Sequence, residues 1–174
     1  IKKNGKLNFG NSGTLARLLI GILSTTPKIE TNIYGDKSLS KRNMESLINL
    51  MEKFGAYFLP KNKFYFPLKL ISSSFPVGMN YKAGVSAQLK RAVMLAGLNS
   101  YGNTIITEKQ ISRDHTENIF MNNHQVMKIK KKPKKTITVF GKRNLNSIKI
   151  NVPNDPSSAA FFTALTLLNK NSSL

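Results

Sequence analysis

Residues 12–24 of the chain read SGTLARLLIGILS, and residues 86–98 read SAQLKRAVMLAGL. Each stretch opens with a serine, a residue suited to capping a helix. Apolar residues spaced over one helical face follow Ser12, and the second stretch is typical of a mostly buried helix. The two serines are 74 residues apart. We therefore expect two equivalent helices in a duplicated unit.

Strand-like and helical stretches follow each of these helices in the same order. After the first helix we expect a strand at 29–33, a helix at 44–54 that Gly55 ends, and strands at 56–59 and 64–71. The second unit should begin with an extended stretch near Tyr81. It should continue with a strand at 103–107, a helix with Asp114 and Glu117 as its capping box, and strands at 126–129, 136–140 and 148–152.

This order is β-α-β-α-β-β, written twice, and it predicts an α/β fold built by duplication. Solenoid repeats have shorter periods. A last helix should run to Leu168, with Asp155 as its cap and Pro156 at its first position. We expect the chain to enter a new unit there.

Composition restricts the possible chemistry. Hydrophobic residues make up 40% of the 174 residues, which is enough for a packed core. The absence of cysteine excludes disulfides, thiolate metal sites and a cysteine nucleophile. The two histidines, His115 and His124, do not suggest a zinc site, and His115 is expected to be structural. No cofactor is expected.

The formal charge of +19 has three possible explanations. It could serve nucleic-acid binding, it could lie on solvated faces, or part of it could serve small polyanionic substrates. Residues 128–135 form the densest basic run, but Pro133 interrupts it and it holds no aromatic residue that would stack on bases. A solvated hairpin is therefore favoured over a nucleic-acid interface.

Four segments combine a predicted helix start with groups that attract anions, since the first turn of a helix leaves N–H groups free. Gly10–Thr14 offers two glycines, so that a ligand can approach the backbone. Arg42 offers a planar fork for carboxylate or phosphate. The other two segments open the third and fourth helices. They are Ser86-Ala87-Gln88 and Ser112-Arg113-Asp114-His115.

Six motifs in order resemble the 3-phosphoshikimate 1-carboxyvinyltransferase (enolpyruvylshikimate-phosphate synthase) family. The likeness extends from about residue 8 to residue 168. Each motif alone is weak evidence, and the resemblance is specific because all six occur in the same order. The motifs are GNSGT with Arg17, GD…LSKR at 35–42, SAQLK at 86–90, AGL at 96–98, SRDHTE at 112–117 and VPNDPSSAAFF at 152–162.

The resemblance implies the two-domain enolpyruvyl transferase fold, with residues 1–152 forming most of one domain and residues 153–174 crossing into the other. It implies transfer of the enolpyruvyl group of phosphoenolpyruvate to the 5-hydroxyl of shikimate 3-phosphate, with release of phosphate. The family enzyme is expected to be cytoplasmic and monomeric at full length, without nucleic acid, membrane or metal. Retention of Gly13 implies sensitivity to glyphosate.

The resemblance also implies site residues. Asn11, Gly13, Arg42 and Gln88 would bind phosphoenolpyruvate. Shikimate 3-phosphate would contact a second set of residues, which shares one member with the first: Ser86, Ala87, Gln88, Ser112 and Arg113. The family's acid/base residues have no counterpart in this chain, so we name no catalytic residue and expect an internal fragment without turnover.

Two positions depart from the family pattern: Asn43 replaces a proline after Arg42, and Arg91 occupies a place that is normally small. Three alternatives remain open. One is the sibling enzyme that acts on UDP-N-acetylglucosamine, whose usual active-site cysteine is missing here. The others are a basic nucleic-acid-binding module without catalysis and a decayed, non-catalytic paralogue.

Overall fold

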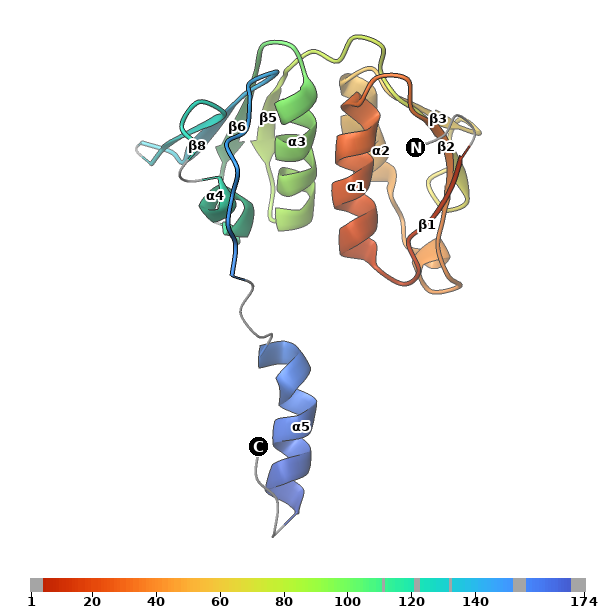
Figure 1. Cartoon of the computed structure of the whole chain (residues 1–174). Helices are drawn as coiled ribbons and strands as arrows, with labels where there is room; N and C mark the ends of the chain where they lie inside the picture. The colour runs from red at the N-terminus through yellow and green to blue at the C-terminus, as the bar shows by residue number, and fades with distance from the viewer. Residues whose placement is uncertain (1–4, 111, 121–122, 132, 152–155, 170–174) are drawn as a thin grey trace.

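The computed structural model describes the chain except for residues 1–4, 111, 121–122, 132, 152–155 and 170–174 (Figure 1). Its elements form two units with the same order. The first unit consists of β1 (Gly5–Asn8), α1 (Gly13–Thr25), β2 (Glu30–Tyr34), a short 3-10 helix η1 (Leu39–Lys41), α2 (Glu45–Lys53), β3 (Tyr57–Leu59) and β4 (Leu68–Ile71). The second consists of β5 (Asn80–Ala83), α3 (Ala87–Asn99), β6 (Asn103–Glu108), α4 (His115–Ile119), β7 (Met127–Lys130) and β8 (Thr136–Phe140).

The two sheets share one topology, which confirms the predicted duplication. Strand order is β1-β2-β4-β3 in the first sheet and β5-β6-β8-β7 in the second. In each sheet the first two strands are parallel and the remaining pairs are antiparallel. A parallel pair needs a crossover connection, and α1 and α3 supply it.

Helices α1 and α3 pack side by side between the sheets and join the two units (Figure 1). The helices are parallel, because hydrogen bonds connect Gln88 to Thr14 near their starts and Asn99 to Thr25 at their ends. They approach closely at Gly21, where a Cβ would lie 2.6 Å from the carbonyl oxygen of Ala92. The N-terminal ends of both helices consequently lie at the same end of the molecule.

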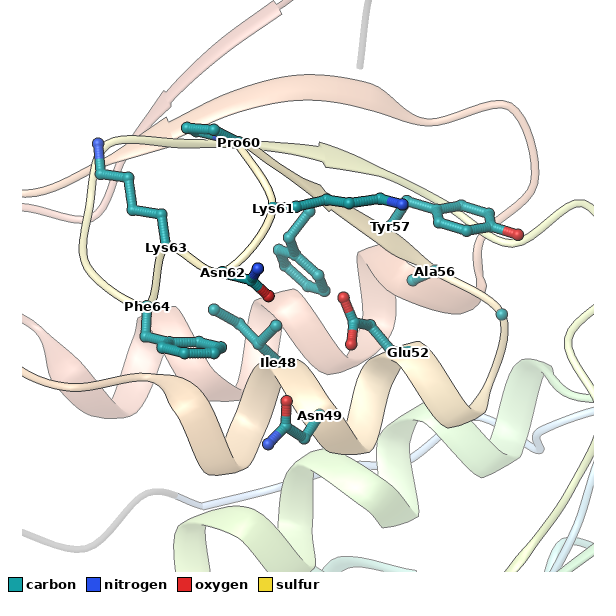
Figure 2. A pocket seen from close by; sticks show the side chains of 12 residues that line it. Ile48, Asn49, Glu52, Ala56, Tyr57, Pro60, Lys61, Asn62, Lys63 and Phe64 are labelled. Carbon is teal, nitrogen blue, oxygen red and sulfur yellow. The ribbon is translucent and has the colours of Figure 1, made fainter.

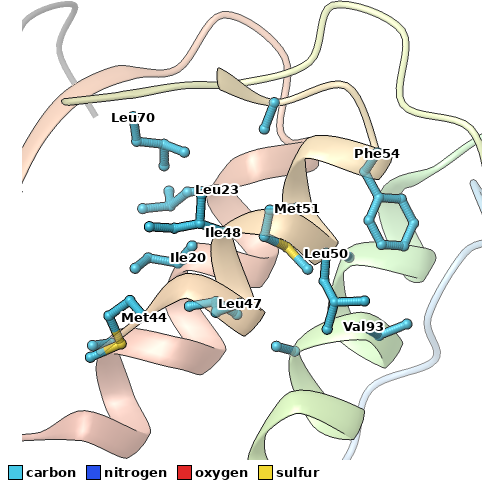
Figure 3. Close-up of a cluster of buried hydrophobic side chains, with 14 of the residues drawn as sticks. Ile20, Leu23, Met44, Leu47, Ile48, Leu50, Met51, Phe54, Leu70 and Val93 are labelled. Carbon is cyan, nitrogen blue, oxygen red and sulfur yellow. The ribbon is translucent and has the colours of Figure 1, made fainter. Parts of the chain in front are cut away.

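The core of the first unit is apolar and centres on α2 (Figure 3). This helix packs against α3, α1 and β3, and it buries Leu47, Ile48, Leu50 and Met51. Complete burial of one such side chain contributes about 1.5–3 kcal/mol. The helix ends at the predicted place, since Gly55 has φ of +89°, a conformation that suits glycine.

The structure corrects two sequence expectations and locates one strand. Residues 148–151 belong to no strand, so the predicted strand at 148–152 is wrong for its described part. The capping box is also wrong: the side chain of Asp114 caps no N–H of α4, and Glu117 is buried in an ion-pair cluster. The first strand of the predicted order had been given no residues, and the structure places it at β1, which is short and includes polar residues.

Helix α5 (Pro156–Leu168) lies apart from both units (Figure 1). It begins at the predicted proline, whereas the predicted cap Asp155 is outside the described residues. Large apolar side chains on this helix are exposed, namely Phe161, Phe162, Leu165, Leu167 and Leu168. In the part of the chain that the structure describes, no helix has the length and apolarity that a membrane crossing requires.

Candidate functional site

Two arginines meet over Gly13 at the start of α1. A Cβ at this glycine would lie 2.8 Å from Nη1 of Arg42 and 2.9 Å from Nη1 of Arg17. Arg17 donates from Nη1 to the carbonyl oxygen of Gly13 at 3.1 Å, and Arg42 donates from Nη2 to Oδ1 of Asn11 at 3.1 Å. The predicted residues Asn11, Gly13 and Arg42 are thus brought together, and Gly13 leaves room for both guanidinium groups.

This pair concentrates positive charge. Burial, and then the charge of Arg42, lowers the pKa of the Arg17 guanidinium. Within the described residues, neither arginine forms an ion pair with a carboxylate. Ser12 caps α1 by accepting from the N–H of Leu15 at 3.1 Å. Two guanidinium groups beside a helix N-terminus provide a strong site for a carboxylate or a phosphate.

The start of α3 opens onto a cavity of about 530 Å³. All five residues predicted to bind the second substrate line it, and no carboxylate lines it among the described residues. The lining residues are Thr14, Val85, Ser86, Ala87, Gln88, Arg91, Gln110, Ser112 and Arg113. The lining combines positive charge with hydroxyl and amide groups, a composition that suits an anionic polar ligand.

Gln88 connects this cavity with the arginine pair. Its Nε2 donates to Oγ1 of Thr14 at 2.8 Å, which brings the starts of α1 and α3 together. Gln88 and Ser86 also line a smaller adjoining cavity of about 160 Å³, whose wall includes Arg17 and Asn43. The four predicted segments therefore converge on neighbouring sites, and Gln88 lies where the two cavities meet.

A buried ion-pair cluster holds Ser112 and Arg113 at the larger cavity. Lys90 is completely buried on α3, and its Nζ contacts Oε1 of Glu108 at 3.0 Å, Oε1 of Glu117 at 2.6 Å and the carbonyl oxygen of Arg113 at 3.0 Å. The hydroxyl of Ser112 donates to Oε1 of Glu108 at 2.8 Å. Ser112 and Arg113 thus lie in the loop before α4, not in the helix itself.

Lys135 completes this cluster, with Nζ 2.9 Å from Oε2 of Glu108 and 3.2 Å from Oε1 of Glu117. Burial opposes ionisation of Glu108, but hydrogen bonds from Lys135, Lys90 and Ser112 and the charge of Lys90 outweigh it and lower the pKa of this carboxyl to about 2. The balance of two lysines and two glutamates makes the burial of charge tolerable. The basic hairpin is therefore not entirely solvated, because Lys135 turns inward.

Three residues outside the predicted set help to build the site: Arg17, Lys90 and Arg91. Arg17 stands in a quoted motif, and its place one turn after Gly13 is the signal that would have included it. The role of Lys90 depends on carboxylates 18 and 27 residues away, so no local pattern reveals it.

Another hollow, of about 370 Å³, lies between α2 and the loop that joins β3 to β4 (Figure 2). Ile48 and Phe64 are among the apolar residues of its wall, and its charged residues include both Glu52 and Lys61. It contains no predicted site residue, and its lining mixes carboxylate, amide and ammonium groups. The described residues hold no group of three or more histidine, aspartate or glutamate side chains that would fit a metal ion.

The sequence profile of the family described as EPSP synthase (3-phosphoshikimate 1-carboxyvinyltransferase) matches residues 2–172. A protein of this name from Roseobacter denitrificans is 37% identical over 167 residues, which cover 95% of this chain and 37% of that protein. Another from Vesicomyosocius okutanii is 41% identical over 157 residues, which cover 90% of this chain and 35% of that protein. The chain thus spans little more than a third of the length of these relatives.

Solved structures agree with this result. The structure of EPSP synthase from Acinetobacter baumannii superposes with a TM-score of 0.76 at 36% identity, over 93% of this chain and 36% of that one. The enolpyruvyl transferase NikO from Streptomyces tendae superposes with a TM-score of 0.52 at 12% identity, over 74% of this chain and 30% of that one. This second likeness shows the fold alone, and it is the fold that the sequence resemblance implied.

Proposed function

The chain belongs to the EPSP synthase family, and we propose that it forms a large part of the substrate-binding surface of a 3-phosphoshikimate 1-carboxyvinyltransferase. The enzyme would transfer the enolpyruvyl group of phosphoenolpyruvate to the 5-hydroxyl of shikimate 3-phosphate. The hydroxyl would lose its proton as it attacks C2 of phosphoenolpyruvate while C3 gains a proton. Phosphate would then leave C2 of the tetrahedral adduct as C3 loses a proton, which restores the double bond of the enolpyruvyl group. Such an enzyme would act in the cytoplasm as a monomer.

One observation carries this proposal: an arginine pair that has no carboxylate partner among the described residues adjoins a cationic cavity, and Gln88 lies between them. The reaction brings two polyanions together, so the site must neutralise their repulsion and orient the hydroxyl at C2. Two neighbouring cationic sites meet this requirement. A single extended basic face would fit a nucleic-acid backbone better.

We assign phosphoenolpyruvate to the site over Gly13. Arg42 clamps one of its anionic groups, and Asn11 holds the guanidinium of Arg42 through their hydrogen bond. Arg17 adds a second positive charge. Gln88 contacts both ligands.

We assign shikimate 3-phosphate to the larger cavity, with Arg113 on its phosphate. Ser86, Ala87 and Ser112 line the remaining wall. Because the hydroxyl of Ser112 already donates to Glu108, it would meet the ligand as a hydrogen-bond acceptor.

We assign the proton transfer to no described residue and place it in the remainder of the enzyme. Residues 1–152 would form most of one domain, and residues 153–174 would belong to the other. The exposed apolar side chains of α5 support this division, since such a helix needs a core to cover it. Closure of the two domains would exclude water from C2.

The proposal is tested by titrating the isotope-labelled 174-residue chain with shikimate 3-phosphate and then with phosphoenolpyruvate, with backbone amide NMR as the readout. Shikimate 3-phosphate should shift the amides of residues 86–88 and 112–113, and phosphoenolpyruvate those of residues 11–14. We expect no turnover from this chain. Absence of these shifts at millimolar ligand, or salt-dependent DNA binding that shikimate 3-phosphate does not affect, would contradict the proposal.

A further inference from the structure

Arg91 lies on α3 one turn after Gln88 and lines the larger cavity. The Nε and Nη2 atoms of its guanidinium are buried and have no hydrogen-bond partner among the described residues. Burial of a charged group's donors without a partner is unfavourable, because the donors lose their hydrogen bonds to water and gain none in return. The placement of Arg91 therefore needs a reason that the protein's own contacts do not supply.

The acidic residues described in this unit all contact groups other than Arg91. Glu108 and Glu117 both pair with Lys90 and Lys135. The carboxylate of Asp114 accepts from Asn118 on the surface. The buried carboxylates of this unit thus pair with the two lysines, and in the described part of the chain the guanidinium of Arg91 at the cavity wall has no ion-pair partner.

Arg113, on the same wall, provides a second guanidinium. Its loop is fixed by the contact of Lys90 with its carbonyl oxygen, so both cations come from anchored segments. A phosphate monoester carries close to two negative charges at neutral pH and accepts several hydrogen bonds. Two guanidinium groups on one cavity match that charge, whereas a carboxylate or a neutral sugar would leave one of them unsatisfied.

We propose that Arg91 binds the phosphate group of the ligand together with Arg113, and that it makes the larger cavity select phosphorylated over unphosphorylated ligands. This inference rests on the proposed function for the identity of the ligand, shikimate 3-phosphate. It adds a binding residue that the sequence motifs did not assign. Arg91 places a second guanidinium beside Arg113 on the cavity wall, and its positive charge attracts the ligand phosphate.

The test compares Arg91→Met, Arg113→Met and Arg143→Met with the unchanged chain. Arg143 is exposed and lies outside the cavity lining, so its variant controls for the loss of one charge. Each protein is titrated at fixed salt with inorganic phosphate, shikimate and shikimate 3-phosphate, followed by backbone amide NMR. Arg91→Met should weaken shikimate 3-phosphate binding by about ten- to a hundredfold, as expected for hydrogen bonds to a charged group. Its affinity for shikimate should stay within about twofold, as should all affinities of Arg143→Met.

Unchanged shikimate 3-phosphate affinity in Arg91→Met, with weakened affinity in Arg113→Met, would overturn the inference and leave the proposed function standing. Phosphate binding that depends on Arg91, without tighter binding of shikimate 3-phosphate than of phosphate, would support the inference and overturn the proposed function. Absence of binding by any phosphorylated ligand would overturn both. Should Arg91→Met not fold, Arg91→Lys replaces it. Lysine keeps the charge but loses the fork, so unchanged affinity would overturn the role of the guanidinium.

Discussion

The two units share one order of elements but differ in what fills their interiors. Four residues after each N-capping serine, the first unit has Ala16 and the second has Lys90, and both side chains are fully buried. Helix α2 closes the first unit with apolar side chains, while the much shorter α4 contributes Glu117 to an ion-pair cluster in the second.

This difference shows that one backbone frame accepts an interior without buried ion pairs or one with an ion-pair cluster beside an apolar core, provided that the buried charges balance. The ionic version also serves the site, because Lys90 and Glu108 hold the backbone and side chain of the loop that lines the larger cavity. The stability of the second unit, unlike that of the first, should therefore depend on charge and pH.

The substitution Lys90→Met should produce the largest loss. It leaves Glu108 and Glu117 with only Lys135 between them, and removal of one partner from a buried ion pair costs about 3–5 kcal/mol. Amide hydrogen exchange should accelerate in β6 and β8 and stay unchanged in β1 and β2. The double variant Lys90→Met, Glu117→Met retains the Glu108–Lys135 pair and should recover much of the loss. Equal exchange in both units would contradict the comparison.

Acidification should have a milder effect on the same cluster. Because the pKa of Glu108 is lowered from 4.5 to about 2 in the folded chain, its ionisation stabilises the fold above pH 4.5, and this contribution is lost as the pH falls toward 2. NMR signals of the second unit should weaken over this range before those of the first. Glu108→Gln should be less stable at neutral pH and should flatten the acid profile. Simultaneous loss of both units would count against the assignment.

The substitution Gly21→Ala tests the contact that joins the units. The new Cβ would meet the backbone of Ala92, which cannot turn aside as a flexible side chain would, so we expect a loss of about 1–3 kcal/mol from overpacking. Urea unfolding measures it. Gly84→Ala is the matched control, since nothing lies within 4 Å of the Cβ that it adds, and its midpoint should barely move. A midpoint for Gly21→Ala at or above that of the parent would refute the close approach.

The smallest effects should come from the equivalent caps. Ser12 accepts from Leu15 at 3.1 Å and Ser86 from Leu89 at 3.4 Å. Ser12→Ala should cost about 1 kcal/mol of stability, and Ser86→Ala no more than that because its hydrogen bond is longer. Both are measured by urea unfolding. A clearly larger loss for Ser86→Ala would show that the two helix starts are not equivalent.

Much of the fold could be predicted from the sequence, because the signals that define its long helices lie within or next to each helix. Capping serines and apolar periodicity located α1 and α3, and the stop signal of Gly55 located the end of α2. Segments without a strong local pattern were harder. The predicted strand at 148–152 has β-branched residues at alternate positions, yet its described part pairs with no strand, and pairing is a property of the partner as much as of the segment.

The candidate site, like the fold, could be predicted from the sequence only in part. Gly13, Arg42, Gln88 and Arg113 stand in motifs that are readable along the chain, whereas the contact of Gln88 with Thr14 depends on two helix starts 74 residues apart. The prediction of a capping box was wrong at Glu117. The sequence pattern indicates a partner at the nearby helix start, whereas in the fold the carboxylate of Glu117 is buried and pairs with Lys90 and Lys135.

The sequence by itself therefore determined the helices, the duplication and the residue types that attract anions, since these follow from periodicity, capping and side-chain chemistry over a few residues. Only the tertiary structure decided which cations remain available. It paired Lys90 and Lys135 with buried carboxylates and left Nε and Nη2 of Arg91 without a hydrogen-bond partner among the described residues. The physical reason is that the energy of a buried charge depends on what surrounds it in space, and those neighbours come from distant parts of the chain.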